Sequence, residues 1–272
     1  MGLTKPVVQV DEASIDAATM DRILACTPSA MVLVGGQALA FWMGRYGVGP
    51  VVRPGQSFNA RVTTDADFLG SLDHALQLSA ALDARLVTPN PRQLTAIVAQ
   101  IRMKAASGLE HNIDVLHQLY DIGGLRKSID LTRRARSRAS VAEITGGKTF
   151  QVLHPLDVLA SRVQNAAGLV AHKGVHVLTQ ARWAIKVTQI AIARAAMDTN
   201  EAGERPGALA QEVARLALGA AGRAIANDHS IETAEAIPFD ILNAKVSGFK
   251  TQGLAILLAL HKQGRMQDVR PD

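Results

Sequence analysis

The sequence predicts an α/β half followed by a helical half. A short Val-rich run at 30–34 ends at Gly35-Gly36 and leads into a helical pattern, as a buried strand does before a helix. Further strand-like runs, separated by turn residues, recur up to residue 153. Beyond that point the chain is rich in Ala and Leu at helical spacing. We therefore expect a mixed-sheet domain over residues 1–153 and a helical domain over 154–272.

The elements of the first half follow from local patterns. Apolar residues at helical spacing predict helices, apolar or alternating runs predict strands, and Ser71 is a typical N-cap residue. The Gly- and Pro-containing segment 47–57 predicts a loop. In chain order we expect a helix at 14–25, strand 30–34, helix 37–46, strand 61–69, helix 72–84, strands 94–103 and 109–116, and a hairpin of 141–145 with 149–153.

The second half contains four helical patterns and no clear strand pattern. The segment 201–206 carries Gly and Pro and predicts a loop between helices. The expected helices cover 155–170, 175–197, 208–226 and 253–263.

Composition sets limits on partners and compartment. Aromatic residues make up only 4% of the chain, so single-strand binding on aromatic platforms is not favoured. The net charge of +5 is a mild preference for anionic partners such as nucleotides or RNA. Cys26 is the only cysteine, which excludes an intramolecular disulfide, and the first residues have no signal-peptide pattern. The apolar stretch 253–260 is too short to span a bilayer, so we expect a cytoplasmic protein with no membrane partner.

Three aspartates form the main candidate site. Asp65 and Asp67 lie two apart on a predicted strand, so their side chains share one face of the sheet. Two carboxylates on one face repel each other unless a cation lies between them, and Mg²⁺ (or Mn²⁺) prefers oxygen ligands. Asp114 lies in a second short apolar strand. If the strands are neighbours, the three carboxylates could hold two ions about 3.5–4 Å apart.

Gly35 and Gly36 are a candidate phosphate-binding turn. Between a strand and a helix, two glycines let backbone N–H groups approach a phosphate near the helix N-terminus. Taken separately, a Gly-Gly pair is usually only a turn and an Asp-x-Asp pair is common on surfaces. The two motifs in this order are more informative than either one.

The order of these motifs resembles the minimal nucleotidyltransferase fold. The chain has strand, Gly35-Gly36, helix, then Thr63-Thr64-Asp65-Ala66-Asp67-Phe68, then Asn112-Ile113-Asp114-Val115-Leu116. More narrowly, it resembles the abortive-infection toxin type (AbiEii-like), in which Gly-Gly replaces the Gly-Ser of other branches. The resemblance continues through 152–162, where that family's helical half opens, and covers roughly residues 30–190.

The resemblance implies metal-dependent transfer of a nucleoside monophosphate from an NTP to an RNA or protein acceptor. It implies Asp65, Asp67 and Asp114 as catalytic and metal-binding residues. It also implies that the protein could be a toxin with a cognate antitoxin as its partner. The expected nucleotide-binding residues are Gly35, Gly36, Arg61, Thr63, Thr64 and Arg162.

The chain departs from the family pattern in three places. The spacing from Gly36 to Asp65 is 29 positions, Arg162 stands where Lys is usual, and 180–183 lacks the usual acidic residue. Two alternatives therefore remain open. The domain could be catalytically silent and bind a nucleotide or a partner protein, or the chain could be a helical interaction protein with an incidental acidic strand. The sequence identifies neither the acceptor, the preferred base nor the oligomeric state.

A basic run is the remaining candidate. Arg133, Arg134, Arg136 and Arg138, flanked by Lys127, most often indicate a solvated helix face. Our hypothesis is that this run and Arg162 form one surface that receives RNA, with binding that weakens in salt.

Overall fold

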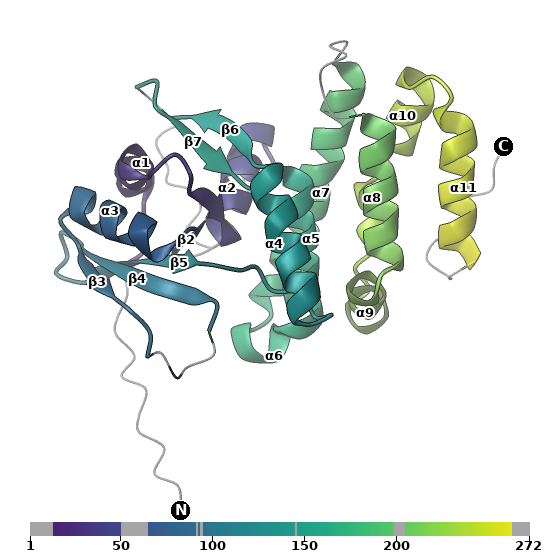
Figure 1. Cartoon of the computed structure of the whole chain (residues 1–272). Coiled ribbons are helices and arrows are strands. Elements are labelled where there is room, and N and C mark those ends of the chain that lie inside the picture. The colour runs from purple at the N-terminus through teal and green to yellow at the C-terminus, as the bar shows by residue number, and fades with distance from the viewer. Residues whose placement is uncertain are drawn as a thin grey trace, which may run out of the picture.

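The computed structural model describes residues 13–49, 65–90, 92, 95–144, 146–198 and 205–262. Within them the protein has an α/β fold, with a mixed sheet in the first half and helices in the second (Figure 1). The predicted fold class is therefore confirmed.

The sheet has seven strands in the order β3-β4-β5-β2-β1-β7-β6. At its centre, β1 pairs antiparallel with β2 and parallel with β7, while β2 pairs parallel with β5. The β6–β7 hairpin and the β4–β5 pair are antiparallel, as the sequence predicted for the hairpin. The strands are β1 Val32–Val34, β2 Ala66–Leu69, β3 Arg85–Val87, β4 Ile97–Lys104, β5 Glu110–Leu116, β6 Ser140–Glu143 and β7 Thr149–Val152.

Four helices belong to the first half. They are α1 Ala17–Cys26, α2 Gly35–Tyr46, α3 Leu72–Leu82 and α4 Leu125–Ser137. Helix α3 lies over β3 and β4 with α1 beside it (Figure 1). Ser71 caps α3 as predicted, since its side chain accepts from the N–H of His74 and His74 accepts from the N–H of Ser71.

Three expectations about the first half need correction. Helix α2 begins at Gly35 rather than at residue 37, because Gly35 has a φ of 67° and turns the chain directly from β1 into the helix. Asp65 lies in a bend before β2, so it is not a strand residue. The three-residue strand β3 had no prediction, since its short pattern is partly exposed. Residues 61–64 of the predicted strand lie outside the described residues.

The second half is helical, as predicted, but is divided into more segments. The expected helix 208–226 is interrupted at Gly219, whose extended backbone separates α8 from α9. Pro206, placed in a predicted loop, is instead the first residue of α8, a position that suits its fixed φ; 201–204 lie outside the described residues. The segments are α5 Pro155–Gly168, α6 Val170–Lys173, α7 His176–Met197, α8 Pro206–Leu218, α9 Ala220–His229, the 3₁₀ turn η1 Thr233–Ala236, α10 Phe239–Lys245 and α11 Phe249–Lys262.

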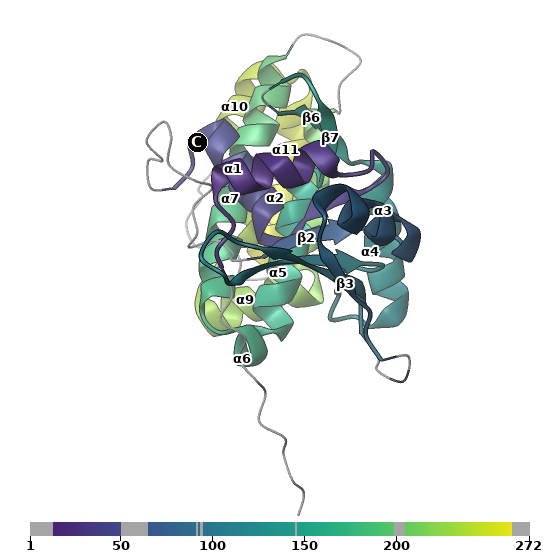
Figure 2. The same cartoon turned by 90° about the vertical axis from the view of Figure 1, so that its left-hand side faces the viewer.

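One continuous hydrophobic core runs through both halves. Helix α2 packs on β1 and β2 and also against α5 and α7, so it lies between the sheet and the helical half (Figures 1 and 2). The indole N–H of the buried Trp42 donates to the carbonyl of Leu153 at 2.8 Å. No helix in the described ranges is long and apolar enough to cross a membrane.

Candidate active site

The candidate site lies beside the first turn of α2, where β1 ends and β2 begins, next to Asp114 of β5. In the strand register Asp67 is opposite Val34 on β1 and beside Asp114 on β5. The two acidic strands are therefore neighbours, which is the condition that the sequence analysis set for a shared site. The antiparallel β1–β2 pair places the carboxylate of Asp67 at the point where β1 turns into the helix.

Gly35 is required by the position of Asp67. Its φ of 67° lies in the left-handed region, which a side chain makes unfavourable. A Cβ at this position would also overlap the Oδ2 atom of Asp67. The carboxylate of Asp67 therefore lies directly against the bare Cα of Gly35 at the start of α2.

The two strand carboxylates repel each other. Burial, and then the neighbouring carboxylate of Asp114, raise the pKa of Asp67 to about 6. Burial also raises the pKa of Asp114. A hydrogen bond from Gln100 lowers this pKa, but its effect is smaller than that of burial. Among the described residues, Oδ1 of Asp114 is buried and has no hydrogen-bond partner. The pair therefore has negative charge that the surrounding protein does not fully neutralise.

Arg162 on α5 is the buried cation of the site. Its side chain is 8% exposed, and its charge lowers the pKa of Asp67. One terminal nitrogen donates to Oε1 of Gln180 at 3.0 Å and the other to Oγ of Ser161 at 3.2 Å. Burial lowers the pKa of Arg162, while Asp67 raises it. The Nε atom of Arg162 is buried without a partner in the described part of the chain.

These groups line one cavity of about 240 Å³. Its polar lining joins the two carboxylates to cationic and amide side chains of α5 and α6. The lining includes Gly35, Asp67, Asp114, Gln118, Ser161, Arg162, Asn165 and Lys173. The cavity is thus acidic on the sheet side and basic on the helical side, an arrangement that suits a metal-bound phosphate.

The fit to a divalent ion rests on this charge distribution. The described residues contain no group of three or more His, Cys, Asp or Glu side chains arranged to hold a metal. Asp65, Asp67 and Asp114 nevertheless interact electrostatically, because Asp65 raises the pKa of both other carboxyls. The carboxylates of Asp67 and Asp114 lie side by side, and one oxygen of Asp114 has no hydrogen-bond partner among the described residues. Mg²⁺ and Mn²⁺ prefer oxygen ligands, so this pair fits either ion.

The structure brings together some of the predicted site residues. Gly35, Asp67, Asp114 and Arg162 line the same cavity, and Asp65 is close enough to affect two of them. Gly36 is buried in the first turn of α2 but is not among the residues that line the cavity. Arg61, Thr63 and Thr64 lie outside the described residues.

Sequence reasoning missed Lys173 and the partners of Arg162. Lys173 is exposed and lines the cavity, and its charge lowers the pKa of both Asp67 and Asp114. It lies on α6, beyond the end of the predicted helix 155–170, so no helical spacing in the sequence related it to Arg162. Gln180 was noted only as a departure from the family pattern, yet it holds the side chain of Arg162.

The hypothesis of one basic surface is wrong. Arg134 and Arg138 of the basic run both form ion pairs with Asp157, which is 0% exposed. Arg162 lines the cavity with Asp67, whereas Arg134 lines a separate pocket. Ala160 of α5 lines the pocket that contains Arg134. Positions 160 and 162 project about 200° apart around α5, so the helix separates Arg162 from the basic run.

Removal of the Arg162 charge should change the titration of Asp67. In Arg162→Gln the pKa of the Asp67 carboxyl should rise above about 6, because the cation that favours its ionised form is lost. Carboxyl-carbon NMR across pH 4–9 would measure the midpoint, with Arg162→Lys as the charge-retaining control. An unchanged midpoint in the Gln variant would show that Arg162 does not act on Asp67.

Comparison of the chain with protein-family models and with curated protein sequences found no match. The resemblance to nucleotidyltransferases therefore stays a prediction. The functional argument below rests on the geometry and charge of the cavity.

Proposed function

We propose that the protein is a metal-dependent nucleotidyltransferase that moves a nucleoside monophosphate from an NTP to an RNA or protein acceptor. The observation that carries the proposal is the Asp67–Asp114 pair. It has a buried, unpartnered oxygen, lies against Gly35 at a helix N-terminus, and shares its cavity with a buried arginine.

The acidic side of the cavity would hold Mg²⁺ or Mn²⁺. Asp67 and Asp114 supply oxygen ligands, and Asp65 adds negative charge from the bend before β2. A bound ion would neutralise phosphate charge and orient the leaving pyrophosphate. As an alternative to binding an ion, Asp114 is the candidate base that accepts the proton of the acceptor group.

The basic side would bind the phosphates. The N–H groups of the first turn of α2 begin at Gly35, and the helix dipole favours an anion there. Arg162 is held by Gln180 and Ser161, so its guanidinium needs little ordering when a phosphate binds. Lys173 adds a second positive charge from α6.

Mg²⁺ should stabilise the protein more at pH 8 than at pH 5. At pH 5 the Asp67 carboxyl, with a pKa of about 6, is mostly protonated, so protons compete with the ion. Thermal unfolding with and without millimolar MgCl₂ would measure the increase in Tm, because an ion that binds only the folded state stabilises it. An equal increase in Tm at pH 5 and pH 8 would show that Asp67 is not a ligand of the metal ion.

The direct test is transfer of label from an NTP. Purified protein is incubated with Mg²⁺, α-³²P-labelled NTP and either total RNA or total protein. We expect label on one of the two, and loss of that label in Asp114→Asn. Asp83→Asn is the matched control, because Asp83 is exposed at a left-handed position that Asn also tolerates. Failure to label either acceptor with a protein that binds neither NTP nor Mg²⁺ would refute the proposal.

A second candidate is a silent domain that binds a nucleotide without transferring it. It is favoured by one observation, that the described residues contain no metal-binding group of three side chains. NTP binding with no product under any acceptor condition would support this candidate. Product formation that depends on Asp114 would exclude it.

A further inference from the structure

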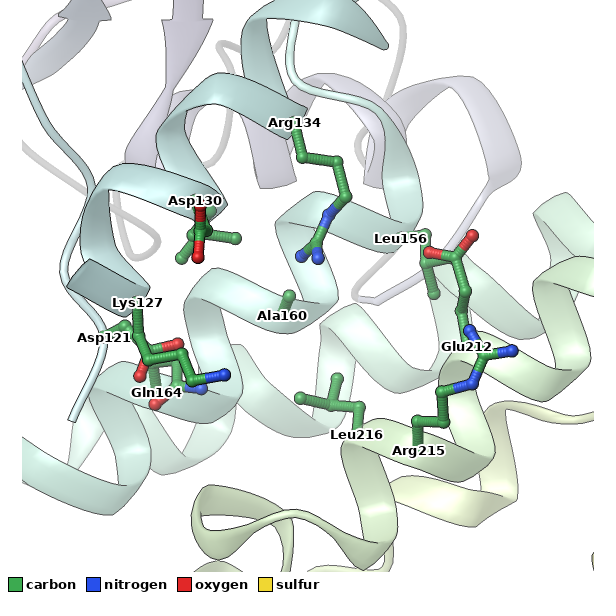
Figure 3. A pocket seen from close by; sticks show the side chains of 11 residues that line it. Asp121, Lys127, Asp130, Arg134, Leu156, Ala160, Gln164, Glu212, Arg215 and Leu216 are labelled. Atoms are coloured by element: carbon green, nitrogen blue, oxygen red, sulfur yellow. The ribbon is translucent and has the colours of Figure 1, made fainter. Parts of the chain in front are cut away.

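A second pocket lies on the other side of α5, away from the candidate active site. It is enclosed by α4, α5 and α8 and has a volume of about 500 Å³, within the range of small-molecule sites (Figure 3). Helix α5 contributes Leu156, Ala160 and Gln164 to this pocket, whereas Ser161, Arg162 and Asn165 line the active-site cavity.

Arg134 is fixed in a position to bind an anion. Its Nε atom donates to the buried carboxylate of Asp157 at 2.9 Å. Within the described residues its terminal nitrogens make no hydrogen bond, and Figure 3 shows the guanidinium directed into the space above Ala160. Because Asp157 orders the side chain in advance, little conformational entropy is lost when an anion binds there.

Two further cations border the pocket. Lys127 on α4 points into the same space, and Arg215 stands on the opposite wall, on α8 (Figure 3). Both side chains are exposed, and neither forms an ion pair with another described residue. The pocket therefore presents cationic groups from two sides.

The acidic residues of the lining cancel only part of this charge. Glu212 is paired with Arg138 at 3.1 Å, and Asp130 is paired with Arg133 at 2.9 Å, both partners lying outside the lining. Asp121 accepts a hydrogen bond from the N–H of Gly123 and keeps its negative charge. Because the buried Asp157 pairs with both Arg134 and Arg138, the positive excess at the pocket is small and comes from Lys127 and Arg215.

The floor of the pocket is apolar. Leu131, Leu156, Ala160 and Leu216 supply it, and Ala160 and Leu216 lie between the two cationic walls in Figure 3. A phosphate ion alone would leave this surface uncovered. A ligand with both an anionic group and an apolar body would use the cations and the floor together.

We propose that this pocket binds a small organic anion, a carboxylate or a phosphate monoester with an apolar body. The anionic group lies at Arg134 and Lys127, Arg215 adds positive charge from the opposite wall, and the apolar part lies on Leu156, Ala160 and Leu216. The site is separate from the nucleotide cavity and needs neither metal nor NTP.

The test uses the full chain without metal and follows the fluorescence of anilinonaphthalene sulfonate, an anionic aromatic probe. We expect the probe to bind, and phenyl phosphate or benzoate to displace it while uncharged phenol does not. The more effective of the two anions identifies the class of head group. In Lys127→Gln and Arg215→Gln the affinity for the better anion should fall roughly tenfold, the loss expected for one charge-assisted hydrogen bond.

Arg126→Gln is the matched control, because Arg126 is the exposed neighbour of Lys127 on α4 and does not line the pocket. Asp67→Asn should also leave binding unchanged, which separates this site from the proposed transfer activity. Equal affinity in Lys127→Gln, Arg215→Gln and Arg126→Gln would overturn the proposal. Displacement by phenol as strong as by the anions would do the same.

Discussion

Asp67→Asn is expected to abolish nucleotide transfer and, at pH 8 without metal, to make the protein more stable. Transfer should fall by at least about 100-fold, since a charged group at the reacting phosphate is lost. Stability should rise by about 1–2 kcal/mol, because the amide removes a carboxylate that is unfavourably ionised. A core substitution would lower both properties, so these opposite signs are diagnostic of a functional carboxylate.

The pH dependence follows from the direction of the pKa shift. The folded-state pKa of Asp67 is raised from 3.8 to about 6, so the folded protein holds this proton more tightly than the unfolded chain. The native protein therefore loses stability as the pH rises from about 4 to above 6. The advantage of the variant should be largest above pH 7 and should vanish near pH 4.

Urea unfolding at pH 4, 6 and 8, with and without Mg²⁺, would measure these differences. Mg²⁺ should stabilise the native protein and leave Asp67→Asn largely unaffected. Asp83→Asn serves again as the control and should match the native protein in all conditions. A variant less stable than the native protein at pH 8 would show that the Asp67 carboxylate has a structural partner.

Gly35→Ala should lower stability by roughly 2–4 kcal/mol and remove activity. The left-handed backbone at Gly35 costs an L-residue about 1–2 kcal/mol, and the new methyl group displaces the carboxylate of Asp67. Thermal unfolding and the label-transfer assay would measure the two effects on the same preparation.

Gly44→Ala is the control for this change. Gly44 lies in the same helix, has no positive φ and has open space where its Cβ would stand. Alanine there should stabilise the helix by about 0.5–1 kcal/mol and leave activity unchanged. Equal behaviour of the two variants would mean that Gly35 has no special role beside Asp67.

Long or well-marked patterns were sufficient for much of the fold. The Ser71 cap, the 140–152 hairpin and the acidic strand around Asp114 follow from local residues, and the structure contains all three. The pairing of Asp67 with Asp114 was only a condition in the sequence analysis, and the structure meets it. Interactions with distant parts of the chain were harder to predict.

The interaction partners of the arginines are the clearest example of contacts that the sequence did not predict. A basic run such as 133–138 is solvated in most helices, and nothing local indicates that Asp157 is buried beneath Arg134 and Arg138. The same holds for Arg162, whose contact with Gln180 joins two helices. The helix break at Gly219, where the backbone is extended, was likewise not predicted, because a single Gly inside a helical pattern does not by itself end a helix.

The unbroken core also has a consequence for how the chain could evolve. Helix α2 packs against α5 and α7, and its Tyr46 lies under Arg194 of α7 at 4.7 Å, so the sheet half relies on the helical half for its cover. A gene fusion or deletion that separated the two at residue 153 would leave α2 with an open apolar side. We therefore expect the two halves to unfold as one cooperative unit, and native-state hydrogen exchange should show amides of β1 and α7 opening together.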